Sequence, residues 1–295
     1  MLELSAVHYV YPGADVAALQ NISLSLHAGD IVGVLGPNGA GKTTLFSLLS
    51  GLTQPSQGQL RWQHNAIQVG LVPQHLAFYG QLSIAENLAF FADIYQLTGA
   101  LRQQQIQLVI AACDLGSRLQ QRAATLSGGW QRRLNFAIGI LRPAELYLFD
   151  EATVGVDAQS RQQLLAAVQQ LAAAGKTLLY TSHYLQETEQ IANRILILQQ
   201  GKLLLDTALN QLAANSRQLM LQWPQQAPAG WAPLLAELGL TSTLLAKGEL
   251  IALQNEQQWA RLQQFIVMQT GQPLWLHYGP PSLEQLYLHV SGGQL

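Results

Sequence analysis

The sequence predicts an α/β protein: a mixed, mostly parallel sheet with an inserted block of helices, followed by a small α+β domain. Three observations support this fold class. Apolar runs alternate with segments of helical spacing up to about residue 205, a glycine-rich turn at residues 36–44 joins such a run to a helix, and the pattern changes after about residue 210. Alternating strands and helices imply a layered sheet whose strands run mostly parallel.

Composition narrows the class of protein. The chain has 295 residues, 49% hydrophobic and 11% charged, which indicates a globular protein with a full-sized core. Its 15 basic and 17 acidic residues give a net charge of −2, so we expect no nucleic-acid partner. The single cysteine, Cys113, cannot form an internal disulfide, which fits a reducing cytoplasm. No apolar stretch is long enough to cross a membrane and the first residues do not resemble a signal peptide, so we expect any membrane association to come through a partner.

The elements follow in order from local patterns. Strands are expected at residues 2–11, 22–26, 31–35, 58–62 and 69–72, then 146–149, 177–180, 195–198 and, after a tight turn at Gln200-Gly201, 203–205. Helical spacing from Ile84 to about Leu141 predicts helices inserted between strands of the core. In the last part, strands are expected at 219–221, 250–253 and 274–276, with helices at 231–238 and 256–268. We therefore expect one domain over residues 1–210, with its helical part at about 75–142, and an accessory α+β domain over 211–295.

The glycine-rich turn predicts a phosphate site. Gly36-Pro37-Asn38-Gly39-Ala40-Gly41-Lys42-Thr43-Thr44 links a buried strand to a helix, so that successive backbone N–H groups and the positive end of the helix point at one spot. The glycines let the backbone wrap a phosphate without Cβ clashes. Lys42 is expected against the β- and γ-phosphates of a nucleoside triphosphate, and the Thr43 hydroxyl is expected to ligate Mg²⁺.

Two further strand ends carry polar groups. The apolar strand at 146–149 ends in Asp150 and Glu151, and because strand ends in such sheets face the nucleotide, we expect Asp150 in the Mg²⁺ shell. Glu151 is then placed to polarise the water that attacks the γ-phosphate, although an acidic pair at a strand end can also be a helix cap. His183 follows the strand at 177–180 and is expected to hydrogen-bond a γ-phosphate oxygen.

A second anion site is predicted ahead of another helix. In Leu126-Ser127-Gly128-Gly129-Trp130-Gln131-Arg132-Arg133, the serine and two glycines stand at a helix N-terminus. One chain with two phosphate-binding helix ends suggests that the second end serves the nucleotide of another subunit.

At this point the chain resembles the ATP-binding subunits of ABC transporters, in which phosphate loop, signature string, acidic strand and switch histidine occur in this order and spacing. The resemblance implies further roles. Tyr11 matches the aromatic that stacks on adenine, Gln74 matches the glutamine that links Mg²⁺ and water to the helical insert, and Asp157 matches the loop at the dimer contact. The implied nucleotide-binding set is Tyr11, Gly36, Pro37, Asn38, Gly39, Ala40, Gly41, Lys42, Thr43, Thr44, Gln74, Ser127, Gly128, Gly129 and Asp157. The implied catalytic residues are Glu151 and His183, and the implied metal ligands are Thr43, Gln74 and Asp150.

Longer strings at residues 82–91, 151–157 and 281–289 are similar to export-type members of this family. That resemblance implies an ATPase that binds ATP and Mg²⁺, works as a head-to-tail dimer, expected to be of two identical chains, and energises export through an integral membrane permease on the inner face of the cell membrane. The sequence departs from the family at two positions: Trp130 stands for the usual glutamine and Ala152 for the usual proline, and we expect altered rates rather than lost activity. The alternative is a soluble ABC ATPase acting on a macromolecular assembly, such as the ribosome or iron–sulphur assembly. Co-purification with a multi-helix membrane protein would separate the two.

Overall fold

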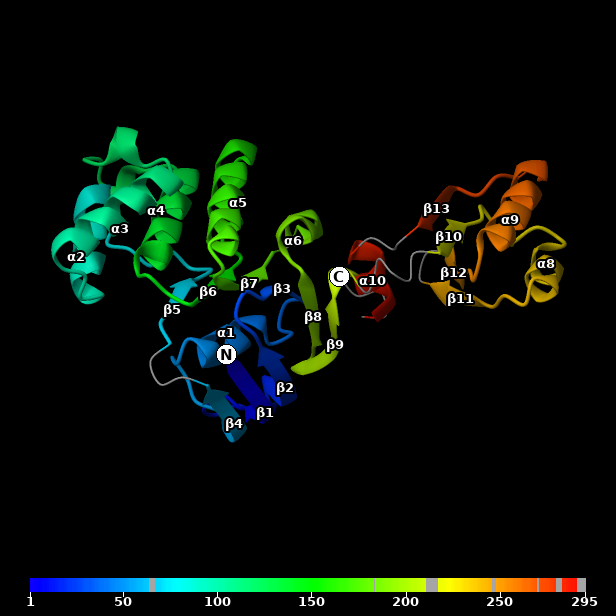
Figure 1. The fold of residues 1–295 in the computed structure, drawn as a ribbon, viewed down its shortest axis with the longest axis horizontal. Helices are drawn as coiled ribbons and strands as arrows, with labels where there is room; N and C mark the ends of the chain where they lie inside the picture. The colour runs from blue at the N-terminus through cyan, green and yellow to red at the C-terminus, as the bar shows by residue number, and fades with distance from the viewer. Residues whose placement is uncertain are drawn as a thin grey trace. The chain divides into compact units, whose positions relative to one another are not determined.

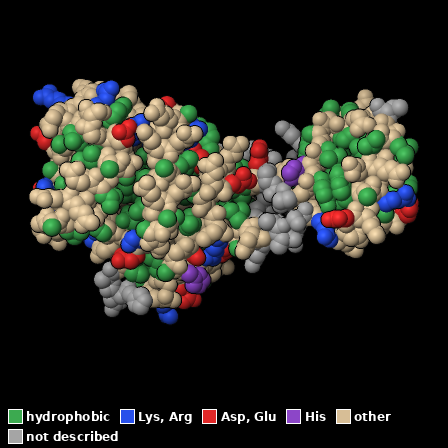
Figure 2. Space-filling view, turned by 45° about the horizontal axis from the view of Figure 1, so that its top comes forward, with side chains coloured by type: hydrophobic (Ala, Val, Ile, Leu, Met, Phe, Trp, Pro, Cys, Tyr) green, Lys and Arg blue, Asp and Glu red, His purple; other side chains and the backbone are tan. Residues whose placement is uncertain are grey.

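A computed structural model describes residues 1–63, 67–182, 184–210, 217–245, 248–269, 271–279 and 283–290. The chain divides into two compact units, Met1–Asp206 and Thr207–Leu295, where the sequence suggested a boundary at residue 210. Figure 1 draws both units, and each is described by itself below. On the face drawn in Figure 2, basic and acidic side chains are interspersed. Among the described residues, none of the helices has the length and apolar character needed to cross a membrane.

The first unit is built on a six-stranded sheet in the order β5-β6-β7-β3-β8-β9. Its strands are β3 (Ile31–Leu35), β5 (Val69–Val72), β6 (Leu146–Asp150), β7 (Thr177–Thr181), β8 (Arg194–Gln199) and β9 (Lys202–Ala208). The pairs β5–β6, β6–β7, β3–β7 and β3–β8 are parallel. Every residue of β6 and β7 is buried, which is why these strands are continuous apolar runs rather than alternating patterns.

A three-stranded antiparallel sheet in the order β2-β1-β4 completes the strands of this unit. It consists of β1 (Leu2–Tyr9), β2 (Leu19–Leu26) and β4 (Gln57–Trp62). The register of β1 shifts around Ala6, whose φ is +48°, so Leu4 and Val7 both reach the core although three positions separate them. Strand β1 ends at Tyr9, two residues before the end that the sequence suggested, and β2 begins at Leu19, three residues before the suggested start.

Two hydrophobic cores lie on opposite faces of the parallel sheet, and β6 contributes to both. Leu146 and Leu148 join the core that contains α1 (Lys42–Leu49) and the antiparallel sheet. Tyr147 and Phe149 join the core formed with the other helices. Figure 1 shows α1 on the side of β1, β2 and β4, and α4 and α5 on the other side. A strand with both faces buried is what a doubly covered parallel sheet requires.

The helical insert lies between β5 and β6 in the chain. It holds α2 (Ile84–Ile94), α3 (Gly99–Ala112) and α4 (Gly128–Leu141), with short 3₁₀ turns at Gly116–Arg118 and Ala123–Thr125. A capping box starts α2: the Ser83 hydroxyl accepts from the Glu86 N–H, and the Glu86 carboxylate accepts from the Ser83 N–H. Helix α4 packs closely on β5, because a Cβ on Gly139 would lie 2.5 Å from Cγ2 of Val72. After β6 come α5 (Ala158–Ala173) and α6 (Leu185–Ile191).

The second unit is α+β. Its antiparallel sheet has the order β11-β12-β10-β13, formed by β10 (Gln218–Gln222), β11 (Ser242–Leu245), β12 (Gly248–Ala252) and β13 (Trp275–Gly279). The helices are α8 (Trp231–Glu237), α9 (Glu256–Met268) and α10 (Leu283–Val290). Strand β11 was missed from the sequence, because it is an edge strand with exposed residues and carries little apolar alternation.

The core of the second unit encloses a carboxylate. Glu249 of β12 is buried, and its Oε1 accepts hydrogen bonds from the indole N–H groups of Trp223 at 3.1 Å and Trp231 at 2.7 Å. Leu219 and Leu221 of the sheet pack in the same cluster. The carboxylate and the two indole N–H groups are all buried, and burying them without hydrogen-bond partners would be costly; these two hydrogen bonds supply the partners.

Candidate functional site

The glycine-rich turn runs from the carboxyl end of β3 into α1, as the sequence predicted. Gly41 precedes the helix with a φ of +103°, and a Cβ there would lie 2.6 Å from the carbonyl oxygen of Ala18. A Cβ on Gly36 would lie 2.3 Å from the carbonyl oxygen of Leu198. Only glycine fits at either position, so the turn keeps its tight course. Asn38 and Gly39 at its tip are exposed, as is Thr43 in the first turn of the helix.

Lys42 lies over this turn. Its ammonium donates to the carbonyl oxygens of Gly36 at 2.7 Å and Pro37 at 3.2 Å, and the residue is 9% exposed. Burial lowers the pKa of Lys42, while the carboxylates of Glu151 and Asp150 act in the opposite direction. The lysine charge therefore lies within electrostatic reach of both acids at the end of β6.

The acidic pair is held by the neighbouring strand. The Thr181 hydroxyl donates to Oδ1 of Asp150 at 3.0 Å and accepts from the backbone N–H of Glu151 at 2.9 Å. The parallel register sets Asp150 directly opposite Thr181. Glu151 has a φ of +50°, an unfavourable conformation for a non-glycine residue, so its turn has to be fixed by its surroundings. The sequence analysis assigned no role to Thr181.

Gln74 reaches the same acid from β5. Its Nε2 donates to Oε2 of Glu151 at 2.7 Å. The segment that carries Gln74 is held by Asn135 of α4, whose amide donates to the Pro73 carbonyl at 3.1 Å and accepts from the Ala77 N–H at 2.7 Å. The end of β5, the end of β6 and helix α4 are thus joined through side chains.

The second predicted anion site is the start of α4. Ser127 precedes the helix without a capping hydrogen bond from its side chain, and Ser127 and Gly128 are exposed. A Cβ on Gly129 would lie 3.1 Å from Oδ2 of Asp157, so this helix start lies against the start of α5. Asp157 caps α5 by accepting from the N–H and the hydroxyl of Ser160 at 2.8 and 2.7 Å, and these bonds lower the pKa of Asp157. Within the described residues, no hydrogen bond or ion pair joins Ser127–Gly129 to the turn at 36–44.

Tyr11 lies at the first turn of α1. Its hydroxyl shares a hydrogen bond of 3.0 Å with Thr44, its ring packs edge-on against Tyr9, and 44% of the residue is exposed. His183 falls outside the described residues.

The two positions that depart from the family pattern are both accommodated. The Trp130 ring is contacted by the guanidinium groups of Arg118 and Arg133, each 4.8 Å from the ring centre. Ala152 is fully buried.

Two arginines, to which the sequence pattern gave no role, also hold this region. Arg132 of α4 donates to the carbonyl oxygens of Gln74 and Val154. Arg133 donates to the Ser160 hydroxyl and pairs with Asp114 at 3.1 Å. The adjacent arginines after the signature glycines were the available signal, but an arginine pair on a helix is more often a solvated face.

The Glu187 carboxylate forms a buried cluster beyond the acidic pair. Its Oε2 accepts hydrogen bonds from Thr153, Tyr180 and Ser182 at 2.7–2.8 Å. Arg161 of α5 forms an ion pair with the same carboxylate at 3.4 Å. This cluster ties the turn after Glu151 to the end of β7.

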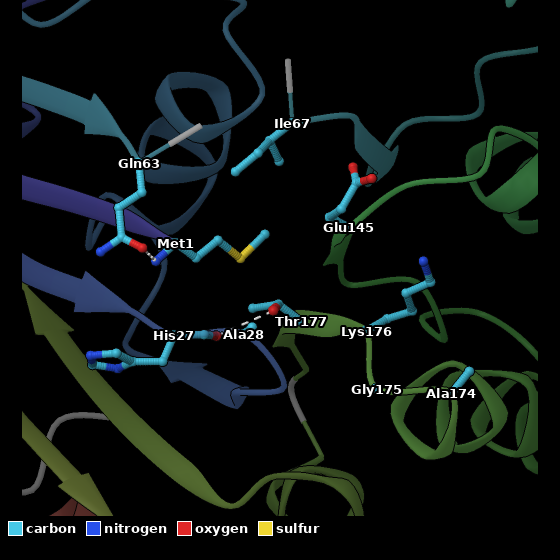
Figure 3. Close-up of a pocket in the computed structure, with 10 residues that line it drawn as sticks. All are labelled: Met1, His27, Ala28, Gln63, Ile67, Glu145, Ala174, Gly175, Lys176 and Thr177. Carbon is cyan, nitrogen blue, oxygen red and sulfur yellow. Dashed lines mark hydrogen bonds between the residues drawn. The ribbon is translucent and has the colours of Figure 1, made fainter. Parts of the chain in front are cut away.

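A cavity of about 580 Å³ opens at the opposite ends of these strands. It includes Glu145 and Lys176, which precede β6 and β7, and Ala28, which follows β2 (Figure 3). The carboxyl ends of parallel strands, where Lys42, Asp150 and Glu151 lie, are the usual ligand edge of such sheets. None of the residues that line this cavity belongs to the predicted site.

Comparisons with known proteins agree with this arrangement. A family model described as ABC transporter matches residues 19–154. The chain is 38% identical over 195 residues to the linearmycin resistance ATP-binding protein LnrL of Bacillus subtilis, covering 63% of each chain, so it spans less than two thirds of that relative. It is 33% identical over 211 residues to the Nod factor export ATP-binding protein I of Cupriavidus metallidurans, covering 68% of this chain and 69% of that one. A solved structure of the ATP binding subunit of an ABC transporter is 23% identical with a TM-score of 0.66, covering 72% of this chain and 92% of that one, which concerns the fold.

Proposed function

This chain belongs to the family of ABC transporter ATP-binding proteins, and on that premise we propose that it hydrolyses ATP to energise export of a substrate through a separate membrane permease. The observation that carries the proposal is the convergence of Lys42, Asp150, Glu151 and Gln74 beyond the carboxyl ends of strands of one parallel sheet. Gln74 follows β5 and the two acids end the adjacent β6, while Lys42 follows β3, which β7 separates from β6. Phosphate, metal and attacking water all need groups at that place.

ATP binding would use the turn at 36–44. The N-terminus of α1 and the backbone N–H groups of the turn favour the β- and γ-phosphates, and Lys42 would exchange its two carbonyl acceptors for phosphate oxygens. Tyr11 is placed at the same turn by its bond to Thr44, with an exposed ring on which adenine can stack. Such stacking contributes about 1–3 kcal/mol per base.

The residues present fit Mg²⁺. Among the described residues, Thr181 binds Oδ1 of Asp150 and no hydrogen bond reaches Oδ2, and Thr43 has an exposed hydroxyl. A carboxylate, a hydroxyl and phosphate oxygens form the kind of ligand set that Mg²⁺ adopts with nucleotides, and Gln74 supplies an amide oxygen nearby. When bound, the ion would neutralise charge that develops on the phosphates.

Hydrolysis would depend on Glu151 as the group that accepts a proton from the attacking water. Gln74 fixes the orientation of this carboxylate through the 2.7 Å hydrogen bond. His183 would contact the γ-phosphate, a role that rests on the sequence pattern. The second site component would come from an identical subunit: the exposed start of α4, with Ser127, Gly128 and Gly129, would close over the phosphates of the partner's ATP, beside Asp157.

The permease would contact the segment that follows Gln74. Tyr79 is 52% exposed and packs edge-on to Phe90 at 4.7 Å, and Leu76 is 44% exposed. The Asn87 side chain holds the backbone of Tyr79: its Oδ1 accepts from the Tyr79 N–H, and its Nδ2 donates to the Tyr79 carbonyl oxygen. An exposed tyrosine that packs on a half-buried phenylalanine, with an exposed leucine on the same fixed segment, suits a protein partner. Because the segment begins at Gln74, its displacement by a permease would reach Glu151.

Export is the direction suggested by relatives named for Nod factor export and linearmycin resistance. The chain would then act at the inner face of the cell membrane, attached through the permease, with residues 1–210 as the ATPase domain and 211–295 as an accessory domain. The alternative, an ATPase acting on the ribosome or on iron–sulphur assembly, would not need a membrane partner.

The test uses Glu151→Gln in the purified chain. We expect kcat for ATP hydrolysis to fall by about two or three orders of magnitude, with a stable ATP-bound dimer in size-exclusion chromatography. Glu145→Gln is the matched control, because it makes the same change at the exposed opposite end of β6, and it should retain activity. Turnover of Glu151→Gln at the rate of the control would contradict the assignment. Detergent extraction without a co-purifying multi-helix membrane protein would contradict the transport role.

A further inference from the structure

Arg132 connects helix α4 to both catalytic strand ends. Its half-buried guanidinium donates from Nη1 to the carbonyl oxygen of Gln74 at 2.6 Å and from Nε to the carbonyl oxygen of Val154 at 3.2 Å. Gln74 follows β5 and Val154 follows β6, and these strands are parallel neighbours. One side chain of the helical insert therefore bridges two segments of the sheet.

Both acceptors adjoin Glu151. The Gln74 amide donates to the Glu151 carboxylate at 2.7 Å, and the N–H of Val154 donates to the Glu151 carbonyl at 3.1 Å, which closes the turn. Because Glu151 has a φ of +50°, this turn depends on outside contacts to keep its conformation. Arg132 supplies two of these contacts, each of them a hydrogen bond from a charged donor.

The charges agree with this role. Burial lowers the pKa of Arg132, and the Glu151 carboxylate opposes that effect, so the guanidinium and the carboxylate lie close enough to stabilise each other. An arginine in a protein keeps its proton, so the bridge carries a permanent positive charge.

Arg132 lies close enough to the start of α4 to transmit a movement of that helix start. Arg132 lies four residues after Gly128, about 6 Å along the axis of α4 from the exposed helix start. A hydrogen bond of 2.6 Å tolerates a shift of less than about 1 Å before it weakens. A misplacement of about 1 Å in a catalytic group can cost about a hundredfold in rate. Movement of the helix start is therefore coupled to the placement of Glu151.

We propose that Arg132 is a positioning residue that couples the two ATP sites of the dimer. The start of α4 closes over the partner's nucleotide, and Arg132 passes that closure to Gln74 and to the turn that holds Glu151, which acts on its own subunit's nucleotide. Closure at one site then aligns the carboxylate at the other, which makes ATP hydrolysis cooperative. This inference rests on the proposed function.

The experiment measures ATP hydrolysis by the full chain as a function of ATP concentration, in the wild type, Arg132→Gln, Arg132→Lys and Arg102→Gln. We expect Arg132→Gln to lower kcat about tenfold and to bring the Hill coefficient from above one to about one, with a KM for ATP within about twofold of the wild type. Arg132→Lys, which keeps the charge and one donor position, should lose about threefold in kcat. Arg102→Gln makes the same charge change on α3, where Arg102 pairs with Asp93, and should behave as the wild type.

Two measurements distinguish a positioning role of Arg132 from a purely structural one: the melting temperatures of the Arg132 variants, and a double-mutant cycle on kcat. Arg132→Gln in the Gln74→Ala background should have less than half of its effect on kcat, because the path through the Gln74 amide, which is the one that reaches the carboxylate itself, is already broken and only the path through the Val154 turn remains. A Hill coefficient of one in the wild type, or an unchanged Hill coefficient in both Arg132 variants, overturns the inference. An effect that is equally large in both backgrounds also overturns it. The proposed function is tested separately by Glu151→Gln, which should lower kcat by orders of magnitude whether or not the sites are coupled.

Discussion

Replacement of Thr181 by valine tests how the acidic pair is held. The Thr181 hydroxyl is fully buried and makes two short hydrogen bonds: it donates to the Asp150 carboxylate at 3.0 Å and accepts from the N–H of Glu151 at 2.9 Å. A longer contact of 3.4 Å reaches the carbonyl oxygen of Phe149. Valine has the same shape, so the change removes the hydroxyl and leaves the packing of β7 in place. The effect therefore reports on the hydrogen bonds of this hydroxyl, chiefly the two short ones.

The size of the effect follows from what is left unpaired. A buried N–H without an acceptor costs about 1–3 kcal/mol, and a lost hydrogen bond to a charged group costs about 1.5–3 kcal/mol. Because the two contacts share one oxygen, their costs are not fully additive, and we expect the free energy of unfolding to fall by about 3 kcal/mol. At a urea dependence of about 3 kcal/mol per molar, the midpoint of unfolding of the first unit shifts by about 1 M.

Urea unfolding followed by far-ultraviolet circular dichroism, with ATP hydrolysis measured in parallel, provides the assay. Thr181→Ser is the control, because it keeps the hydroxyl and removes only a methyl group. It should lose about 1 kcal/mol. Valine should also lower kcat about tenfold, since the turn at Glu151 loses a fixed point. A Thr181→Val midpoint equal to that of Thr181→Ser would refute the reasoning.

Two further predictions concern stability. The pKa of Asp157 is lowered by its bonds from Ser160, so the stabilisation from its charge is fully present above the unfolded value of about 4 and is lost as pH falls through the lower folded pKa. The melting temperature of the wild type should therefore exceed that of Asp157→Asn at pH 7 and approach it at pH 2–3; a constant difference would exclude an effect of charge. In the second unit, Glu249→Ala leaves two buried indole donors without an acceptor and should cost about 3 kcal/mol, whereas Glu249→Gln keeps an acceptor oxygen and should cost less. Tryptophan fluorescence during urea unfolding measures both variants, and equal losses would contradict the role of the oxygen.

Local rules explain what the sequence predicted correctly. The turn at residues 36–44 is recognisable because its glycines, its lysine and the adjoining strand and helix are contiguous in the chain. Strands β6 and β7 are recognisable because burial on both faces requires uninterrupted apolar runs. Edge strand β11 was missed because its exposed positions weaken the apolar pattern, and the early start of β2 was missed because the polar residues Gln20 and Asn21 interrupt it.

The contacts that complete the site could not be predicted in this way. Thr181 supports Asp150 because the parallel register of β6 and β7 sets them opposite each other, and that register is not encoded in either strand alone. Arg132 is 58 residues from Gln74 and 22 from Val154 in the chain, and its side chain gives no sign of which carbonyl groups it will meet.

By itself the sequence determined the class of fold, the phosphate-binding turn, the acidic strand end and the second helix start with its glycines, because each depends on residues that are neighbours in the chain. Only the tertiary structure decided which side chains hold Glu151 in its unfavourable conformation and which residue joins helix α4 to it. The physical reason is that strand order and register bring distant residues within hydrogen-bond range, where distance and direction, rather than residue type, select the partner.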